Sequence, residues 1–386
     1  MMSLAREGAL PEWRLHLERL PAAADLVARV VRDRYPKLDP PVHARWRHFV
    51  FDGRDLCADM FKARDWTDPA AAARAAFDLV LVSVLLDAGA GPSWRYRDAA
   101  RGAYAARSEG LALASLRWFE AGGLSDDPSD PLRVDSAALK RVDVRAIHEA
   151  FQVADDNPLV GAAGRASLLN RLGAAVEARP EIFARADAPR PGGLFDAMAG
   201  QADSRVLPAA AILETLLDAL GGIWEGRPSL GGVPLGDCWP HPSFQGDRAE
   251  ERYVPLHKLS QWLTYSLIEP LENAGISVCG VEELTGLAEY RNGGLFVDTQ
   301  VLVPGAGASR THAVSDPFVV AWRALTVGLL DLIAPLVAER LGLAAAAFPL
   351  ARVLEGGTWA AGRLIAQEKR ADGGPPFLIQ SDGTVF

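Results

Sequence analysis

The stretch DPAAAARAAFDLVLVSVLLDAGAGPSW, residues 68–94, decides the fold. Asp68 followed by Pro69 is typical of a helix start, because the aspartate can accept a hydrogen bond from a free backbone N–H and proline suits the first helical position. The run that follows is apolar on every face, which predicts a helix buried on all sides. It ends at the glycines and proline of residues 89–92, which predict a loop. We therefore expect a central helix.

Helical periodicity dominates much of the remaining chain. Apolar spacing predicts further helices within residues 97–123, 136–153, 158–178, 207–224, 254–275 and 315–342. Strand-like patterns occur only late, at 293–305 and at 375–386, where Asp382-Gly383 suggests a turn. The predicted fold class is therefore mainly α: a large helical fold with a minor β-hairpin or small sheet in the C-terminal half.

A stretch rich in proline, glycine and arginine, residues 177–196, is the best candidate for a domain boundary. It divides the chain into a helical N-terminal region, 1–190, and a helical C-terminal region, 191–386, which would hold the small β element and most of the candidate site. One continuous domain is the alternative, because 386 residues allow both arrangements.

Composition limits the classes of partner. The hydrophobic share of 49% and the charged share of 23% are those of a globular protein. A net charge of -9 disfavours nucleic acid, because phosphate backbones require clustered positive charge. No apolar run approaches the roughly 18 residues of a membrane span, and the start has no apolar core of signal-peptide length. With three widely spaced cysteines as well, we expect a cytoplasmic protein with neither nucleic acid nor membrane as partner.

Familiar catalytic motifs are missing from the sequence. There is no P-loop, no dinucleotide-binding glycine pattern, no His-Glu-x-x-His and no nucleophile elbow. Nucleotide hydrolysis on a P-loop and nicotinamide-linked redox chemistry are thereby excluded. Polar and aromatic residues gather instead in loops, where binding residues often lie.

The loop GDCWPHP, residues 236–242, is the first of these. A zinc site would use Cys238, His241 and His257 with a carboxylate as the fourth ligand. Structural zinc sites usually show a second close ligand pair, which this chain lacks, so we expect no cofactor and keep zinc as the alternative. The loop could also line a substrate site through Asp237, or be a turn that packs Trp239 into the core.

The predicted helix 254–275 carries a polar and aromatic stripe. His257 precedes Lys258 and Trp262, which are spaced so that both fall on one helix face. Such a stripe could line a pocket, and a half-buried helix with satisfied polar tips is the alternative.

Two glycine pairs mark further candidates. Glu289 and Arg291 stand just before Gly293-Gly294, where backbone can come close to a ligand and an arginine can form an ion pair or a phosphate fork. A second segment predicts a helix N-terminus whose free amides would favour an anion, with Arg363 following on the helix. Its residues are Gly356, Gly357 and Thr358.

The first half contributes one more loop cluster. Asp87 and Trp94 flank a glycine-rich turn, and Ser108 and Glu109 follow later in the chain. An aromatic side chain beside such a turn could stack a planar base or a urea-like group, and structural capping is the alternative.

Several of these segments together resemble a known family. HKLSQWLTYSLIEPLE (257–272), LTGLAEYRNGGLFVD (284–298), LEGGTWAAGR (354–363) and the closing SDGTVF (381–386) are similar to the fourth uracil-catabolism protein of fungi and its bacterial relatives, otherwise a domain of unknown function. The resemblance implies a uracil-degradation route in which the pyrimidine is handled at the nucleotide level, opened by a cyclohydrolase-like enzyme, and finally yields urea. Association with that cyclohydrolase is a further implication.

The route requires a hydrolase for the bond between ribose and urea, and we assign that step to this chain as a hypothesis. Breaking an N-ribosyl bond requires a carboxylate near the anomeric carbon and a second group that assists the leaving nitrogen. The predicted catalytic pair is Asp237 and Glu289. The predicted substrate-binding residues are Trp94, Trp239, His241, His257, Lys258, Trp262, Arg291, Gly356, Gly357, Thr358 and Arg363. A zinc hydrolase of a ring-opened pyrimidine, or a noncatalytic scaffold for the cyclohydrolase, are the alternatives.

Overall fold

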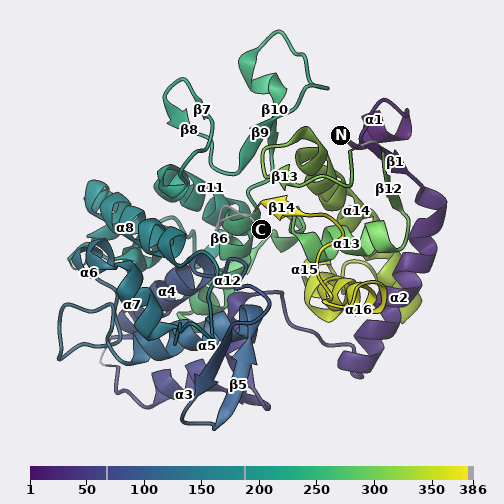
Figure 1. The fold of residues 1–386 in the computed structure, drawn as a ribbon. Helices are drawn as coiled ribbons and strands as arrows, with labels where there is room; N and C mark the ends of the chain where they lie inside the picture. Colours follow the sequence, from purple (N-terminus) through teal and green to yellow (C-terminus); the bar gives the residue numbers. More distant parts are fainter. Residues whose placement is uncertain (67, 187, 306, 381–386) are drawn as a thin grey trace.

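The computed structural model describes residues 1–66, 68–186, 188–305 and 307–380, and it is mainly helical, as predicted (Figure 1). Its helices are α1 Met2–Arg6, α2 Leu20–Arg34, α3 Leu56–Lys62, α4 Pro69–Leu85, α5 Arg107–Glu120, α6 Ser136–Arg141, α7 Val144–Ala150, α8 Ala162–Ala178, α9 Pro180–Phe183, α10 Leu194–Ala199, α11 Ala209–Leu220, α12 Lys258–Asn273, α13 Tyr290–Asp298, α14 Pro317–Leu341, α15 Leu350–Val353 and α16 Trp359–Lys369.

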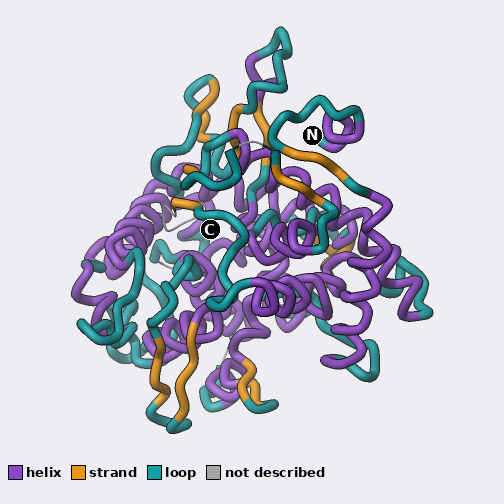
Figure 2. Tube along the Cα trace, turned by 45° about the vertical axis from the view of Figure 1, so that its right-hand side comes forward, coloured by secondary structure: helices purple, strands orange, loops and turns teal. Residues whose placement is uncertain are grey.

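The strands form short two-stranded pairs (Figure 2). The antiparallel pairs are β1 Trp13–Leu15 with β12 Leu302–Pro304, β2 Val50–Phe51 with β3 Arg54–Asp55, β4 Arg95–Asp98 with β5 Ala103–Ala106, β7 Ser229–Leu230 with β8 Val233–Pro234, and β9 Cys238–Pro240 with β10 Tyr253–Pro255. The parallel pairs are β6 Val206–Pro208 with β11 Ser277–Cys279 and β13 His312–Ala313 with β14 Ile379–Gln380. The minor β content is thus confirmed, but it also occupies the first half of the chain, where none was predicted.

Helix α4 is the buried helix that its sequence predicts. Asp68 caps it by accepting the Ala70 N–H at 2.9 Å, and every side chain from Ala75 to Leu85 is buried. Because each large apolar side chain gains about 1.5–3 kcal/mol on burial, this helix supplies a major part of the core. It packs against α5, α10 and α12.

Asp78, in the middle of α4, is fully buried and lies in an ion pair with Arg190. Its carboxylate also accepts the backbone N–H groups of Val134 at 2.9 Å and Gly192 at 2.5 Å. A Cβ on Gly192 would sit 2.3 Å from the Arg74 carbonyl oxygen, so glycine permits this close approach. The proline- and glycine-rich segment that predicted a boundary is therefore held against the central helix.

Two groups of helices lie on either side of α12 (Figure 1). One contains α3 to α11, and the other contains α13 to α16 together with α1 and α2 from the start of the chain. Helix α2 packs on α14, and β1 pairs with β12, so residues 1–34 lie with the C-terminal elements. One hydrophobic core runs through both groups, and the division near residue 190 stays a prediction.

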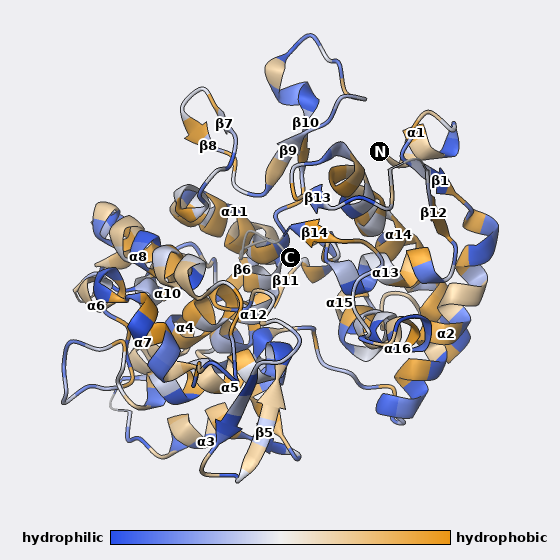
Figure 3. Ribbon diagram, viewed as in Figure 1, coloured by the Kyte–Doolittle hydropathy of each residue, from blue (hydrophilic) through white to orange (hydrophobic). Residues whose placement is uncertain are grey.

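Helix α14 is the most extended apolar element (Figure 3). Among the described residues it is the one helix long and apolar enough to cross a membrane by length and composition. In this structure 61% of its most apolar 18-residue window is buried inside the molecule. Helix α14 is longer than any uninterrupted apolar run in the sequence, because its 25 residues include the charged Arg323 and Asp331.

Three local predictions differ from the structure. The helix predicted from residue 97 begins at Arg107, because residues 95–106 form the β4–β5 hairpin. The helix predicted over 136–153 is divided, since Asp143 caps a new helix by accepting the Ala146 N–H. The strand predicted from residue 293 is helix α13 up to Asp298, followed by β12. The turn predicted at Asp382-Gly383 lies outside the described residues.

Candidate functional site

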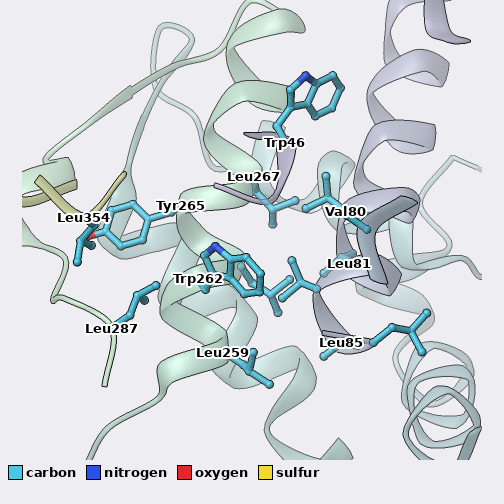
Figure 4. Close-up of a cluster of buried hydrophobic side chains, with 14 of the residues drawn as sticks. Trp46, Val80, Leu81, Leu85, Leu259, Trp262, Tyr265, Leu267, Leu287 and Leu354 are labelled. Atoms are coloured by element: carbon cyan, nitrogen blue, oxygen red, sulfur yellow. The ribbon is translucent and has the colours of Figure 1, made fainter. Parts of the chain in front are cut away.

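Helix α12 presents the first two side chains of the candidate site, Lys258 and Trp262, one turn apart. Val80, Leu81 and Leu85 of α4 pack on one side of this helix, with Leu287 and Leu354 on the other (Figure 4). The Arg45 guanidinium lies 5.6 Å and the Lys258 ammonium 5.9 Å from the Trp262 ring centroid. Two cations therefore meet one buried aromatic ring.

Arg45 is the central cation of this region and has no exposed surface. Its Nε donates to Ser83 Oγ at 2.7 Å, and its Nη1 lies 3.1 Å from Asp87 Oδ2. Ser108 Oγ donates to the same Asp87 oxygen at 2.6 Å, and it lies 3.2 Å from Nδ1 of His48. The negative form of Asp87 thus satisfies both a guanidinium and a hydroxyl.

Asp87 follows directly on the C-terminal end of α4, an unfavourable place for a carboxylate because helix C-termini carry partial negative charge. Buried Arg165 offsets this by donating to the carbonyl oxygens of Leu86 at 2.9 Å and Ala88 at 2.8 Å. Its guanidinium thereby fixes the backbone on both sides of Asp87. A carboxylate kept at an electrostatically unfavourable helix C-terminus is typical of a functional site.

His48 is held in its neutral form beside these groups. Burial, followed by the positive charge of Arg45, lowers the pKa of His48 to about 4. Arg45 Nη1 donates to His48 Nδ1 at 3.2 Å, so Nδ1 is the accepting nitrogen of the imidazole. The ring lies 5.8 Å from Trp262 and 6.4 Å from Trp359, which makes a wall of three aromatic rings.

Glu289 reaches the same region from the other helix group. As the cap of α13 it accepts the N–H of Arg291 at 2.7 Å and the N–H of Asn292 at 2.5 Å. Burial raises the pKa of its carboxyl, while these two hydrogen bonds act in the opposite direction. Glu289 is therefore a buried carboxyl group that keeps its proton to higher pH than an exposed glutamate does.

Lys258 joins the two carboxyl groups. Burial lowers the pKa of its ammonium, and the charges of Asp87 and Glu289 oppose that change. The same two carboxyl groups act on the Tyr290 hydroxyl, whose pKa is raised mainly by burial. We name Asp87, Lys258, Glu289 and Tyr290 the Lys258 cluster. It brings together two carboxyl groups in different environments, a cation and a phenol.

Three arginines gather next to this cluster. The guanidiniums of Arg291 and Arg363 lie 5.8 Å and 5.7 Å from the Trp359 ring centroid. Arg363 Nη1 also lies 3.2 Å from Glu109 Oε1. Burial, then the positive charge of Arg291, lowers the pKa of Arg107. We name Arg107, Arg291 and Arg363 the arginine cluster.

Buried polar atoms without a hydrogen-bond partner border both clusters. Nearly all buried polar groups in proteins are paired, so each exception needs a reason, and a ligand that is not bound is one such reason. Within the described part of the chain, seven of these atoms lie on η2 (Arg45–Phe49) and on the segments 257–262, 292 and 358, which carry or adjoin the two clusters: Arg45 Nη2, Arg47 Nε, His257 Nδ1, Gln261 Oε1, Trp262 Nε1, Asn292 Oδ1 and Thr358 Oγ1.

Asp237, predicted as catalytic, is fully engaged in this structure. Arg323 donates to both of its oxygens, at 2.7 Å and 2.6 Å. Trp239 Nε1 and the Lys258 backbone N–H donate to it as well, at 2.8 Å and 3.0 Å. Although burial opposes the change, Arg323 holds the pKa of Asp237 well below its usual range. Asp237 therefore positions the start of α12, and the geometry gives it no free oxygen for catalysis.

Other predicted binding residues belong to the core. Trp94 is buried, and its Nε1 donates to the Phe151 carbonyl at 2.9 Å. Trp239 packs in a separate small core with Val254, and buried His241 lies near Phe244. Trp239 contacts Asp237, which accepts the Lys258 backbone N–H, so it supports the start of α12 through that carboxylate.

The residues of the zinc alternative, Cys238, His241 and His257, are not grouped as metal ligands in the described part of the chain. Cys238 is buried, which raises the pKa of its thiol to about 11. His257 stands at the start of α12, where burial lowers the pKa of its imidazole. Within the described ranges, no three His, Cys, Asp or Glu side chains are grouped so as to hold a metal ion.

Gly356 and Gly357 do not begin a helix. They lie inside η7 (Leu354–Thr358), a π-helical segment that continues into α16. A Cβ on Gly357 would come within 2.5 Å of Val27, so the glycine lets α2 approach closely. The preceding Glu355 accepts the Tyr35 hydroxyl at 3.0 Å. The helix N-terminus predicted here is wrong, so free backbone amides give no support for an anion site. π-segments nevertheless often occur at functional sites, and this one precedes Trp359.

Arg45, His48, Arg107 and Trp359 belong to the site but are not among the residues predicted from the sequence. The sequence places Asp87, Ser108 and Glu109 in a candidate loop cluster without predicting a catalytic or binding role for them. A positive φ of 55° at Arg107, unusual for a residue other than glycine, could not be read from composition or periodicity. Lys258, Trp262, Glu289, Arg291 and Arg363 were predicted, and the structure brings them to the two adjoining clusters.

A surface hollow of about 490 Å³ lies elsewhere, between α5, α6 and α7. Trp118, Arg141 and Glu149 are among the residues that line it. We do not place the site there, because the grouping of two buried carboxyl groups with cations and aromatic rings occurs at the Lys258 cluster.

Comparisons with known proteins agree on one family. The profile described as "Protein of unknown function (DUF1688)" matches residues 1–386. Uracil catabolism protein 4 of Lachancea kluyveri is 35% identical over an alignment of 420 positions, which covers 98% of this chain and 93% of that protein. Protein urg3 of Schizosaccharomyces pombe is 37% identical over 398 residues, which cover 100% of this chain and 95% of that protein.

Proposed function

Because this chain belongs to the DUF1688 family and is similar over nearly its whole length to a uracil catabolism protein, we propose that it acts in uracil catabolism as an N-ribosyl hydrolase. The bond cleaved would join ribose to urea or to a uracil-derived group. The observation that carries the proposal is the geometry at Trp262, where the Lys258 ammonium and the guanidinium of the Arg45–Asp87 ion pair lie over one ring. Glu289 belongs to the same Lys258 cluster and comes from the other helix group.

The two carboxyl groups suit the two tasks of the reaction. Asp87, whose carboxylate accepts from Arg45 and Ser108, can stabilise the positive charge that develops on the ribose ring, or orient water toward the anomeric carbon. Glu289, whose pKa is raised by burial, can donate a proton to the departing nitrogen. The bond between the anomeric carbon and nitrogen breaks, and urea leaves with the proton from Glu289. The oxygen of water bonds to the anomeric carbon, and the proton that this water releases passes to Asp87 and finally restores the protonated form of Glu289.

The aromatic wall supports a planar leaving group. Trp262 is buried and its Nε1 has no partner, so it can contact a flat amide face or donate to a carbonyl oxygen. Gln261 Oε1 can accept from an amide N–H of urea or of a pyrimidine. These groups match the hydrogen-bonding pattern shared by urea and uracil.

The decisive assay incubates purified protein with N-ribosylurea, with and without a 5′-phosphate, and measures release of urea and of the sugar. Element analysis of the same preparation reports any bound metal. We expect urea and sugar in equal amounts from at least one of the two substrates. Absence of both products from both substrates would remove the hydrolase proposal.

Glu289→Gln tests the proton donor. We expect kcat to fall by about 100-fold, the lower end of the range that general acid catalysis contributes. A donor must be protonated, so wild-type kcat should fall as pH rises through the raised pKa of Glu289, and the variant should lose this alkaline limb. The measurement is kcat against pH for both proteins.

The control for Glu289→Gln is Asp143→Asn, because Asp143 also caps a helix, α7, by accepting a backbone N–H. Because an amide oxygen still accepts the backbone N–H, both variants keep a capping acceptor, and Asp143→Asn should change stability by only a few tenths of a kcal/mol. Only Glu289→Gln should change the pH profile. An unchanged alkaline limb in Glu289→Gln would remove Glu289 as the proton donor.

A further inference from the structure

Among the residues that the structure describes, the arginine cluster holds more positive charge than its neighbours balance. Three guanidiniums face one paired carboxylate there, that of Glu109, which leaves a surplus of two positive charges. Glu289 also acts on Arg291, but Lys258 offsets that carboxyl group. Like charges brought together in this way destabilise a fold unless an anion occupies the space between them.

Each of the three guanidiniums lies close to the loop at residues 372–373, to the Trp359 ring, or to both. Arg107 Nη2 lies 3.4 Å from the Asp372 carbonyl oxygen, and Arg291 Nη1 lies 3.4 Å from the carbonyl oxygen of the next residue, Gly373. Arg291 and Arg363 both lie over the Trp359 ring. The contacts to these neutral carbonyls are long, so the guanidiniums keep donors available for a stronger acceptor.

Two further features favour an anion at this place. Arg107 has a φ of +55°, a conformation that costs free energy for a non-glycine residue and is often found at functional sites. It is also the first residue of α5, a helix of 14 residues whose N-cap, Ala106, provides no side-chain hydrogen bond. The backbone N–H groups of that first turn can therefore donate to the same ligand.

We propose that Arg107, Arg291 and Arg363 bind the 5′-phosphate of the substrate, so that the hydrolase acts on a ribose 5-phosphate derivative. A phosphate monoester carries about 1.5 to 2 negative charges near neutral pH, which matches the surplus of two. Planar guanidiniums recognise phosphate oxygens in pairs. The arginine cluster adjoins the Lys258 cluster, because Glu289 accepts the backbone N–H of Arg291.

This assignment rests on the proposed function for its substrate, but binding can be tested without turnover. The probes are ribose 5-phosphate, ribose and inorganic phosphate, measured by calorimetry on the full chain. We expect ribose 5-phosphate to bind at least about 10-fold more tightly than ribose, because each charge-assisted hydrogen bond contributes roughly 1.5 kcal/mol or more, which corresponds to a factor of ten. It should also bind more tightly than inorganic phosphate, because inorganic phosphate lacks the contacts of the sugar.

Arg363→Met removes one guanidinium, and Arg64→Met is its matched control. Arg64 also lies over a tryptophan, Trp66 at 4.5 Å, and pairs with a carboxylate, Asp130 at 2.6 Å, with similar exposure. Arg363→Met should weaken ribose 5-phosphate about 10- to 100-fold and leave ribose unchanged. Arg64→Met should change neither. Arg107→Gln removes a different guanidinium of the same cluster, and its affinity for ribose 5-phosphate tests the cluster independently of Arg363.

The outcomes separate the phosphate site from the reaction. Equal affinity for ribose and ribose 5-phosphate, or an Arg363→Met protein that binds ribose 5-phosphate normally, overturns the site. Inorganic phosphate binding as tightly as ribose 5-phosphate overturns the substrate assignment in favour of a free phosphate ligand. Arginine-dependent ribose 5-phosphate binding without release of urea from either ribosylurea keeps the site and removes the hydrolase proposal.

Discussion

Asp87→Asn is expected to lower kcat for N-ribosylurea cleavage by about 1,000-fold, within the range that a positioned catalytic carboxylate contributes. The asparagine keeps the size of the side chain and can still accept from Ser108, but it cannot balance the charge developing on the ribose ring. KM should change less than kcat, because the lost interaction strengthens only in the transition state. Steady-state kinetics over a range of substrate concentrations provide both constants.

The control for Asp87→Asn is Asp196→Asn. Asp196 also pairs with an arginine, since Arg74 donates to both of its oxygens at 2.8 Å, but it lies on α10 away from the Lys258 cluster. Its kcat should stay within about twofold of wild type, as expected for a group outside the site. If Asp87→Asn retained more than about a tenth of wild-type kcat, Asp87 could not be the group that stabilises the ribosyl cation.

The sequence predicted the helices that local rules determine. Asp68 and Asp316 cap α4 and α14 as expected, because an aspartate before a proline satisfies the first free N–H groups without help from tertiary structure. Prediction from the sequence fails where tertiary contacts determine the secondary structure. Residues 293–298 look β-like, but Glu289 caps α13 and Gly293 lets Trp322 pack closely, which favours helix.

The candidate site was predicted only in part, for a physical reason. Residues on regular helices, such as Lys258 and Trp262, can be grouped from their spacing alone. Arg45 joins the site through a 3₁₀ turn, η2 (Arg45–Phe49), that has no periodicity to read. The ion pair of Asp237 could not be predicted, because its partner, Arg323, lies 86 residues away in sequence. Pairing of buried charges at such separation is a property of the fold, not of local sequence.

Arg323→Met is expected to lower the free energy of unfolding by about 3–5 kcal/mol, as is typical when one partner of a buried ion pair is removed. Arg323 is almost fully buried, and it donates to both oxygens of Asp237 and to the Ala288 carbonyl at 3.0 Å. Without it the Asp237 carboxylate stays buried with two remaining donors, Trp239 Nε1 and the Lys258 N–H. Urea-induced unfolding at pH 7.5 measures the change.

The pH dependence of this loss has a definite sign. In the wild type Arg323 depresses the pKa of Asp237, so the contribution of Asp237 is complete above its unfolded value, about 3.9, and is lost as pH falls below it. In Arg323→Met burial dominates and raises that pKa, so acidification toward pH 4.5 neutralises the stranded carboxylate. The stability deficit should therefore shrink between pH 7.5 and pH 4.5, and the double variant Arg323→Met/Asp237→Asn should recover part of it at pH 7.5. A deficit that grows in acid, or a double variant less stable than Arg323→Met, would show that the buried charge of Asp237 is not what Arg323 balances.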